Sequence, residues 1–153
     1  KVVHVGKNTS SYMNTRSISK SGGISTFRSS VVVEKGAKGA KSAVSCQSLM
    51  LDSESRSDTI PAMDIRTKDA AIGHEAKIGA ISNEAVFYLM SRGLSENGAR
   101  LVIVESNIRP VIDQLGDETL ANKALRAVRE KMEFCTQKGI CDEKCTERLP
   151  NLN

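Results

Sequence analysis

One cysteine, one histidine and one glutamate are placed where they could act as metal or cluster ligands. Cys46 stands in a β-prone run, where a free cysteine is either a small buried hydrophobe or a thiol ligand. His74 and Glu75 are neighbours at the end of a second β-prone run. Because side chains alternate along a strand, these two should point to opposite faces, so both join one site only at a bend or an interface.

The separation between Cys46 and Glu75 gives a first estimate of their geometry. They are 29 residues apart, which is two turns if one turn of stacked strands takes about 14–15 residues. Neighbouring strands lie about 4.8 Å apart, so the predicted distance is about 10 Å. That distance is too long for one small metal ion. It suits a metal cluster, or a site that a second subunit completes.

Three further cysteines, Cys135, Cys141 and Cys145, crowd the C-terminal end. Structural zinc prefers paired cysteines two to four residues apart, and only one spacing here comes near that pattern. Zinc with a fourth ligand from elsewhere, a cluster site and a disulfide all stay open. Nothing indicates secretion, so we expect reduced thiols and a cytoplasmic protein. A P-loop pattern is absent, so ATP binding of that type is not expected.

Composition narrows the class of protein. Of 153 residues, 39% are hydrophobic and 3% aromatic, which is enough apolar material for a packed core without large rings. Apolar runs long enough to span a membrane are absent. The net charge is +4, and residues 1–81 carry 12 Lys and Arg against 7 Asp and Glu. This excess looks scattered, without a basic stripe, so a nucleic-acid partner is not expected.

The first half of the chain is predicted to form short strands. β-branched clusters between turn signals indicate strands at 2–5, 12–19, 26–34, 42–51, 59–66 and 70–76. Strand starts recur every 10–17 residues or so, a spacing compatible with a sandwich, a barrel or a β-solenoid. Small side chains are abundant and tolerate stacking of like on like, which favours a parallel β-helix.

The second half is predicted to be helical. Ser82 and Ser95 are suited to cap the first two helices, because a serine hydroxyl accepts from free N–H groups of the first turn. Pro110 falls inside the second apolar pattern and should kink or split that helix. Gly116 should end one helix and Asp117 should cap the third.

Several segments together resemble the C-terminal half of the SufB/SufD family of iron–sulfur cluster assembly scaffolds. They are Ser45-Cys46-Gln47-Ser48-Leu49-Met50-Leu51, Thr59-Ile60-Pro61-Ala62-Met63-Asp64-Ile65, His74-Glu75-Ala76, Ile78-Gly79 and Glu84-Ala85-Val86-Phe87-Tyr88-Leu89-Met90-Ser91-Arg92-Gly93-Leu94. The pair of Cys46 and Glu75 is similar to the SufB branch. The last segment is the most specific of these matches.

The resemblance implies a fold and a domain order. It implies a mostly β chain, a right-handed parallel β-helix followed by a C-terminal helical domain. The expected parts are β-helix rungs at 1–81, a helical ATPase-docking domain at 82–133 and a cysteine-containing tail at 134–153. Because family members are two to three times longer, we expect the chain to be the C-terminal part of a longer protein.

The resemblance also assigns site residues. Cys46 matches a cysteine proposed to receive sulfur or to hold the nascent cluster, and Glu75 matches a carboxylate proposed as an iron or cluster ligand. His74 lies beside it, where SufD-like partners contribute a histidine at the subunit interface. Thiolate is the preferred ligand of iron–sulfur clusters, and carboxylate or imidazole ligands suit a cluster that must be handed on.

Partners follow from the same resemblance. A SufC-like ABC ATPase is expected to dock on helices 82–115, so ATP acts only through that partner and the chain itself is not an enzyme. A second SufB-like or SufD-like subunit is expected to pair through the β-helix, and a sulfur donor system to supply sulfur. The expected cofactor is a transient iron–sulfur cluster. The alternatives are a non-catalytic SufD-like structural subunit and a zinc-binding module built on the tail cysteines.

Overall fold

A computed structural model describes residues 1–138, with side chains through residue 132. The chain divides into two compact units, Lys1–Ile81 and Ser82–Asn153, and each is described by itself. The first unit consists of strands and the second of helices. Helices in the described residues are all too short or too polar to cross a membrane.

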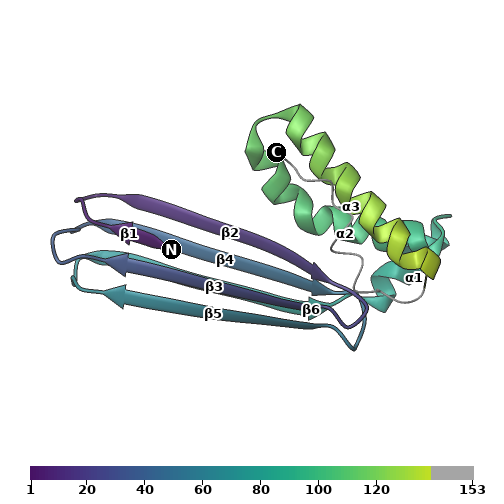
Figure 1. Ribbon diagram of the computed structural model, residues 1–153, viewed down its shortest axis with the longest axis horizontal. Coiled ribbons are helices and arrows are strands. Elements are labelled where there is room, and N and C mark those ends of the chain that lie inside the picture. The colour runs from purple at the N-terminus through teal and green to yellow at the C-terminus, as the bar shows by residue number, and fades with distance from the viewer. Residues whose placement is uncertain (139–153) are drawn as a thin grey trace. The chain divides into compact units, whose positions relative to one another are not determined.

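The strand unit contains two parallel sheets (Figure 1). Its strands are β1 (Val2–His4), β2 (Ser10–Ser19), β3 (Ile24–Val33), β4 (Ala40–Met50), β5 (Arg56–Ile65) and β6 (Ala70–Ala80). One sheet has the order β1-β3-β5 and the other β2-β4-β6, so successive strands alternate between the sheets. The prediction of a mostly β chain with parallel sheets is confirmed.

The pairing register sets the length of one repeat. Val2 pairs with Val31, Ser10 with Lys41, and Ala40 with Ala70, offsets of 29 to 31 residues. The expected turn of about 14–15 residues is therefore wrong. Each repeat contains two strands, one per sheet, so the spacing of strand starts along the sequence measures only half a repeat.

The core lies between the inner faces of the two sheets. Every second residue of β4 is buried from Ala40 to Ser48, as expected for a strand with one face inward. The core cluster is Val31, Val33, Ala37, Ala40, Val44 and Cys46, with Met13, Phe27, Ala70 and Ile72 packed against it. Small and β-branched side chains therefore fill this interior.

Serine ladders lie among these apolar side chains. The Ser11 and Ser42 hydroxyls are 2.8 Å apart, and those of Ser17 and Ser48 are 2.7 Å apart. Each pair joins β2 to β4 at equivalent positions, so one hydroxyl satisfies the other inside the core. A buried hydroxyl without a partner would cost about 1–3 kcal/mol, so these pairs favour one register.

The helical unit contains α1 (Asn83–Ser91), α2 (Glu96–Ile112), the 3₁₀ turn η1 (Asp113–Leu115) and α3 (Glu118–Lys138). The predicted caps are confirmed: Ser82 accepts from the Ala85 N–H and Asp117 from the Leu120 N–H. Gly116 has a φ of 67°, the left-handed conformation that ends a helix at low cost to glycine.

Two further features of the helices concern Pro110 and the end of α3. Pro110 lies inside α2, which continues to Ile112 before tightening into η1, so the proline does not split the helix. It removes one backbone donor, the one that would bond the carbonyl four residues earlier. The α3 helix runs to Lys138 and so overlaps the segment from residue 134 that was predicted as the cysteine-containing tail.

Core packing yields the first stability prediction. Val31 is 1% exposed, whereas Val3 is 47% exposed on the same sheet. Val31→Ala should lower the free energy of unfolding by about 2 kcal/mol, since it removes buried methyl groups and leaves a cavity. Val3→Ala, the matched control, should change it by less than about 0.5 kcal/mol. Denaturant unfolding measures both, and equal losses would contradict the assigned core.

An ion pair between α2 and α3 predicts a pH dependence. Arg129 Nη2 donates to Glu105 at 3.2 Å, and this hydrogen bond holds the pKa of Glu105 below its ordinary 4.5. A depressed carboxyl pKa contributes stability above the unfolded-state value, and that contribution disappears as the pH falls through the folded-state value. The wild type should therefore exceed Glu105→Gln in thermal stability at neutral pH, with a gap that closes below pH 4.5.

The control for this pair is a double-variant cycle. In an Arg129→Gln background, Glu105→Gln should have little further effect at neutral pH, because its partner is already gone. A stability gap that widens on acidification would have the wrong sign and would refute the assignment.

Candidate functional site

Cys46 lies on the inner face of the strand unit. It is the seventh residue of β4 and only 6% exposed. Thr15 on β2 and Ala76 on β6 are its partners in the parallel ladders. Small side chains on both neighbouring strands thus leave the sulfur between the two sheets, within reach of groups from both.

His74 and Thr59 approach the Cys46 sulfur. The Sγ atom lies 3.3 Å from His74 Nε2 and 3.4 Å from Thr59 Oγ1. His74 pairs with Val44, two residues before Cys46, and therefore shares its inward face on the adjacent strand. Thr59 belongs to β5 of the other sheet. The three residues form a small polar cluster, named here the Cys46 site, on the inner side of the two sheets.

Thr59 was not among the site residues predicted from the sequence. It is 13 residues from Cys46 and on the opposite sheet, a relationship that strand alternation alone does not reveal. A usable signal was present in the serines. Ser11 and Ser17 reappear 31 residues later as Ser42 and Ser48, which gives the length of a full turn.

Glu75 points away from the Cys46 site. It pairs with Ser45, whose side chain lies on the outer face, and it makes a 3.1 Å ion pair with Lys77. Both of its neighbours in sequence, His74 and Ala76, are on the inner side. The predicted separation of two turns from Cys46 is wrong, because β4 and β6 are adjacent strands. The two side chains are instead divided by the sheet, without the bend that would bring them together.

The side chains of the tail cysteines lie outside the described part of the structure. Cys141 and Cys145 lie outside the described residues, and only the backbone of Cys135, within α3, is described. Across the described side chains, no three Cys, His, Asp or Glu come together as a group that could hold a metal ion. Among the described residues, Cys46 and His74 therefore offer one thiol and one imidazole as a pair of potential ligands.

The chain thus combines two parallel sheets of two-strand repeats, which hold an inward thiol and imidazole, with a following set of capped helices. Residues 1–107 match the family model described as "SUF system FeS cluster assembly, SufBD core domain". The chain belongs to this family.

Relatives with curated names agree. The chain is 41% identical over 133 residues to the iron-sulfur cluster assembly protein SufB of Bacillus subtilis, covering 87% of this chain and 28% of that protein. It is 43% identical over 115 residues to an iron-sulfur cluster assembly SufBD family protein of Mycobacterium bovis, covering 75% and 14% respectively. The chain therefore spans less than a third of the length of these relatives.

Proposed function

We propose that the chain is part of a SufB-like scaffold on which an iron–sulfur cluster is assembled. The observation that carries this proposal is the contact between the Cys46 Sγ atom and His74 Nε2, which lie 3.3 Å apart on the inner face. In this role Cys46 accepts sulfur or ligates the nascent cluster, and His74 supplies the second ligand. The cluster is the cargo of the scaffold.

The donor atoms of the Cys46 site suit iron. Thiolate and imidazole both bind iron in proteins. Bond lengths of about 2.3 Å to sulfur and about 2.0 Å to nitrogen put two ligands of one tetrahedral metal about 3.5 Å apart. The observed 3.3 Å is close to that value. Two protein ligands hold a cluster less firmly than four, which suits its release.

A second subunit is proposed to complete the site. The stacked two-strand repeats support a β-helix, and among the described strands β5 and β6 each pair on one side only. Unpaired strand edges offer free N–H and C=O groups to another chain. Inward-facing Met63, Ile65 and Ile78 are 40–45% exposed at this end. A SufB-like or SufD-like subunit pairing here would cover them and approach His74 and Glu75 on β6.

The helical unit is proposed to dock a SufC-like ATPase. Phe87, Tyr88 and Met90 on α1 are 73%, 57% and 42% exposed, although each is a large apolar or aromatic side chain. Such a patch on one short helix is typical of an interaction surface. ATP hydrolysis then belongs to the partner, and this chain contributes ligands and a docking surface without enzymatic turnover of its own.

Cluster binding is tested by anaerobic reconstitution with iron and sulfide. The tail cysteines Cys135, Cys141 and Cys145 are first replaced by serine, so that they bind no cluster of their own. In that background Cys46→Ser should lose most of the bound iron and the visible absorbance, because the sulfur ligand is gone. His74→Ala should retain iron less firmly against a chelator.

Ser45→Cys is the matched control for this experiment. It places a thiol on the outer face one residue away, and in a Cys46→Ser background it should not restore the cluster. Equal iron binding by the parent and by Cys46→Ser would refute the proposed role of Cys46. Loss of the cluster only when the tail cysteines are replaced would favour the tail as the metal site.

Association through the β5/β6 end is tested by sedimentation. Ile78→Lys puts a charge on the open end of the inner face and should shift the chain toward monomer, by about tenfold or more in the dissociation constant. Val3→Lys is the control and should leave association unchanged. Val3 is exposed and lies on β1, the strand at the opposite edge of the sheet that ends in β5. The reverse pattern would place the interface at β1.

A further inference from the structure

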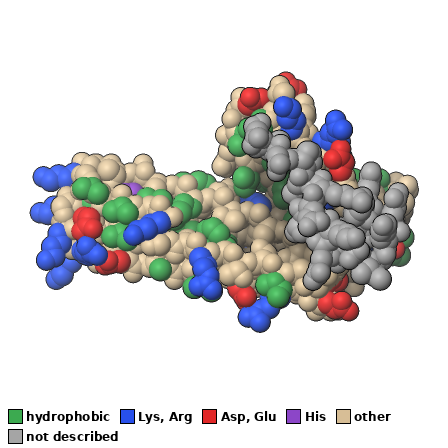
Figure 2. All heavy atoms as spheres, viewed as in Figure 1, with side chains coloured by type: hydrophobic (Ala, Val, Ile, Leu, Met, Phe, Trp, Pro, Cys, Tyr) green, Lys and Arg blue, Asp and Glu red, His purple; other side chains and the backbone are tan. Residues whose placement is uncertain are grey.

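One end of the strand unit is lined by lysines. The turns from β1 to β2, β3 to β4 and β5 to β6 lie together there, and Lys and Arg side chains gather at the left end in Figure 2. The lysines of these turns and of the first residues that follow are named here the lysine edge. They are Lys7, Lys35, Lys38, Lys41 and Lys68, all exposed. Five of the 12 Lys and Arg of residues 1–81, whose positive charge was expected to be scattered, thus lie together at this end.

Three of these lysines lie at or next to equivalent positions in successive repeats. Ser10 pairs with Lys41, and Lys7 and Lys38 each precede that pair by three residues. Ala40 pairs with Ala70, and Lys38 and Lys68 each precede that pair by two residues. Neighbouring strands are about 4.8 Å apart, so Lys7, Lys38 and Lys68 form a column at about that spacing.

Backbone hydrogen bonds join the turns that carry the column. The Asn8 N–H donates to the Lys38 carbonyl at 2.8 Å, and the Gly39 N–H donates to the Asp69 carbonyl at 2.7 Å. The first bond sets Lys38 opposite Lys7. By the same relation the second sets Asp69 opposite Lys38, so Lys68 lies one residue to the side of this position. The three lysines are therefore held close together by backbone bonds between the turns, although the turns differ in length and sequence.

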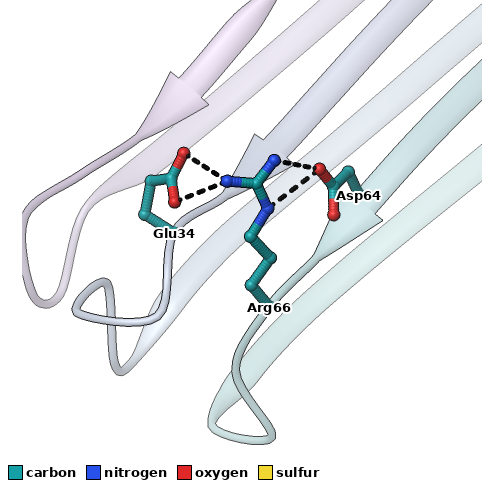
Figure 3. Close-up of polar contacts among 3 residues, drawn as sticks. All are labelled: Glu34, Asp64 and Arg66. Carbon is teal, nitrogen blue, oxygen red and sulfur yellow. Dashed lines mark hydrogen bonds and ion pairs between the residues drawn. The ribbon is translucent and has the colours of Figure 1, made fainter.

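Nearby carboxylates offset only part of the lysine charge, because Arg66 binds two of them, Glu34 and Asp64 (Figure 3). Arg66 Nη1 donates to both oxygens of Glu34 at 3.0 and 2.9 Å, and its Nη2 donates to Asp64 at 2.6 Å. The hydrogen bond from Arg66 also lowers the pKa of Asp64. Across the described residues, none of the five lysines takes part in an ion pair.

Stacking like charges in register is unfavourable. Ammonium groups directly opposite each other on neighbouring strands repel and lower stability. The fold does not require lysine at these positions, since exposed turns accept most polar residues. A carboxylate-bearing partner would relieve the repulsion, and steering by such a patch raises the rate of encounter.

We propose that the lysine edge docks an acidic segment of another protein. Carboxylates are favoured over a phosphate backbone for two reasons. The turn residues 5–9, 34–39 and 66–69 include no aromatic for base stacking. The edge's arginine, the residue best suited to phosphate, is occupied with carboxylates.

The test uses a fluorescent peptide of eight glutamates, with binding followed by anisotropy. Replacing Lys7, Lys38 and Lys68 together by Gln should weaken binding about tenfold, the combined effect of three surface ion contacts. The control replaces Lys20, Lys123 and Lys131 by Gln, which changes the net charge equally away from the column. Binding should also vanish when salt shortens the Debye length to about 3 Å.

A charge reversal keeps the test independent of folding defects. Lys7→Glu, Lys38→Glu and Lys68→Glu in one chain should abolish binding of the glutamate peptide and create binding of an eight-lysine peptide, a gain that an unfolded edge would not produce. An equal loss in the control variant would refute the column as the site. Tighter binding of a polyphosphate of equal charge would refute the preference for carboxylates and assign the edge to phosphate ligands.

Discussion

The register of the parallel sheets is the constraint on which the rest of the molecule depends. Ser10 lies opposite Lys41 and Ala40 opposite Ala70, so one repeat takes about 30 residues and two strands. Because side chains alternate strictly, a slip of one residue would turn every inward group outward. Cys46 would then leave the core for the outer face. The core, the Cys46 site and the lysine edge are three consequences of one pairing.

The interior contains its own means of keeping that register. Valine stacks offer apolar area in almost any alignment, so they stabilise the stack without specifying it. The serine pairs behave differently, because Ser11 must meet Ser42 for both hydroxyls to be satisfied. An unpaired hydroxyl in the core costs about 1–3 kcal/mol. The serine pairs thus select one register, and the apolar stacks stabilise it. The serine pairs also leave small side chains beside Cys46.

Sequence reasoning succeeded where the signal was local and failed where it was distant. β-branched runs and turn residues located the strands, and Ser82 and Asp117 located two helix starts, since a cap involves only the first turn. The length of a repeat was missed, because strand spacing does not say which strands pair. Thr59 was missed for the same reason, and the lysines of the column looked scattered because they are about 30 residues apart.

His74 and Glu75 make contacts on the two opposite faces of the edge strand β6. Adjacent in sequence, they point to opposite faces of β6, one toward the Cys46 sulfur and the other toward Lys77. The lysine edge is separate from both, since Cys46 lies six residues along β4 from Ala40. At 3.3 Å per residue that is about 20 Å. An acidic partner on the lysine edge would therefore leave the Cys46 site free for a second subunit.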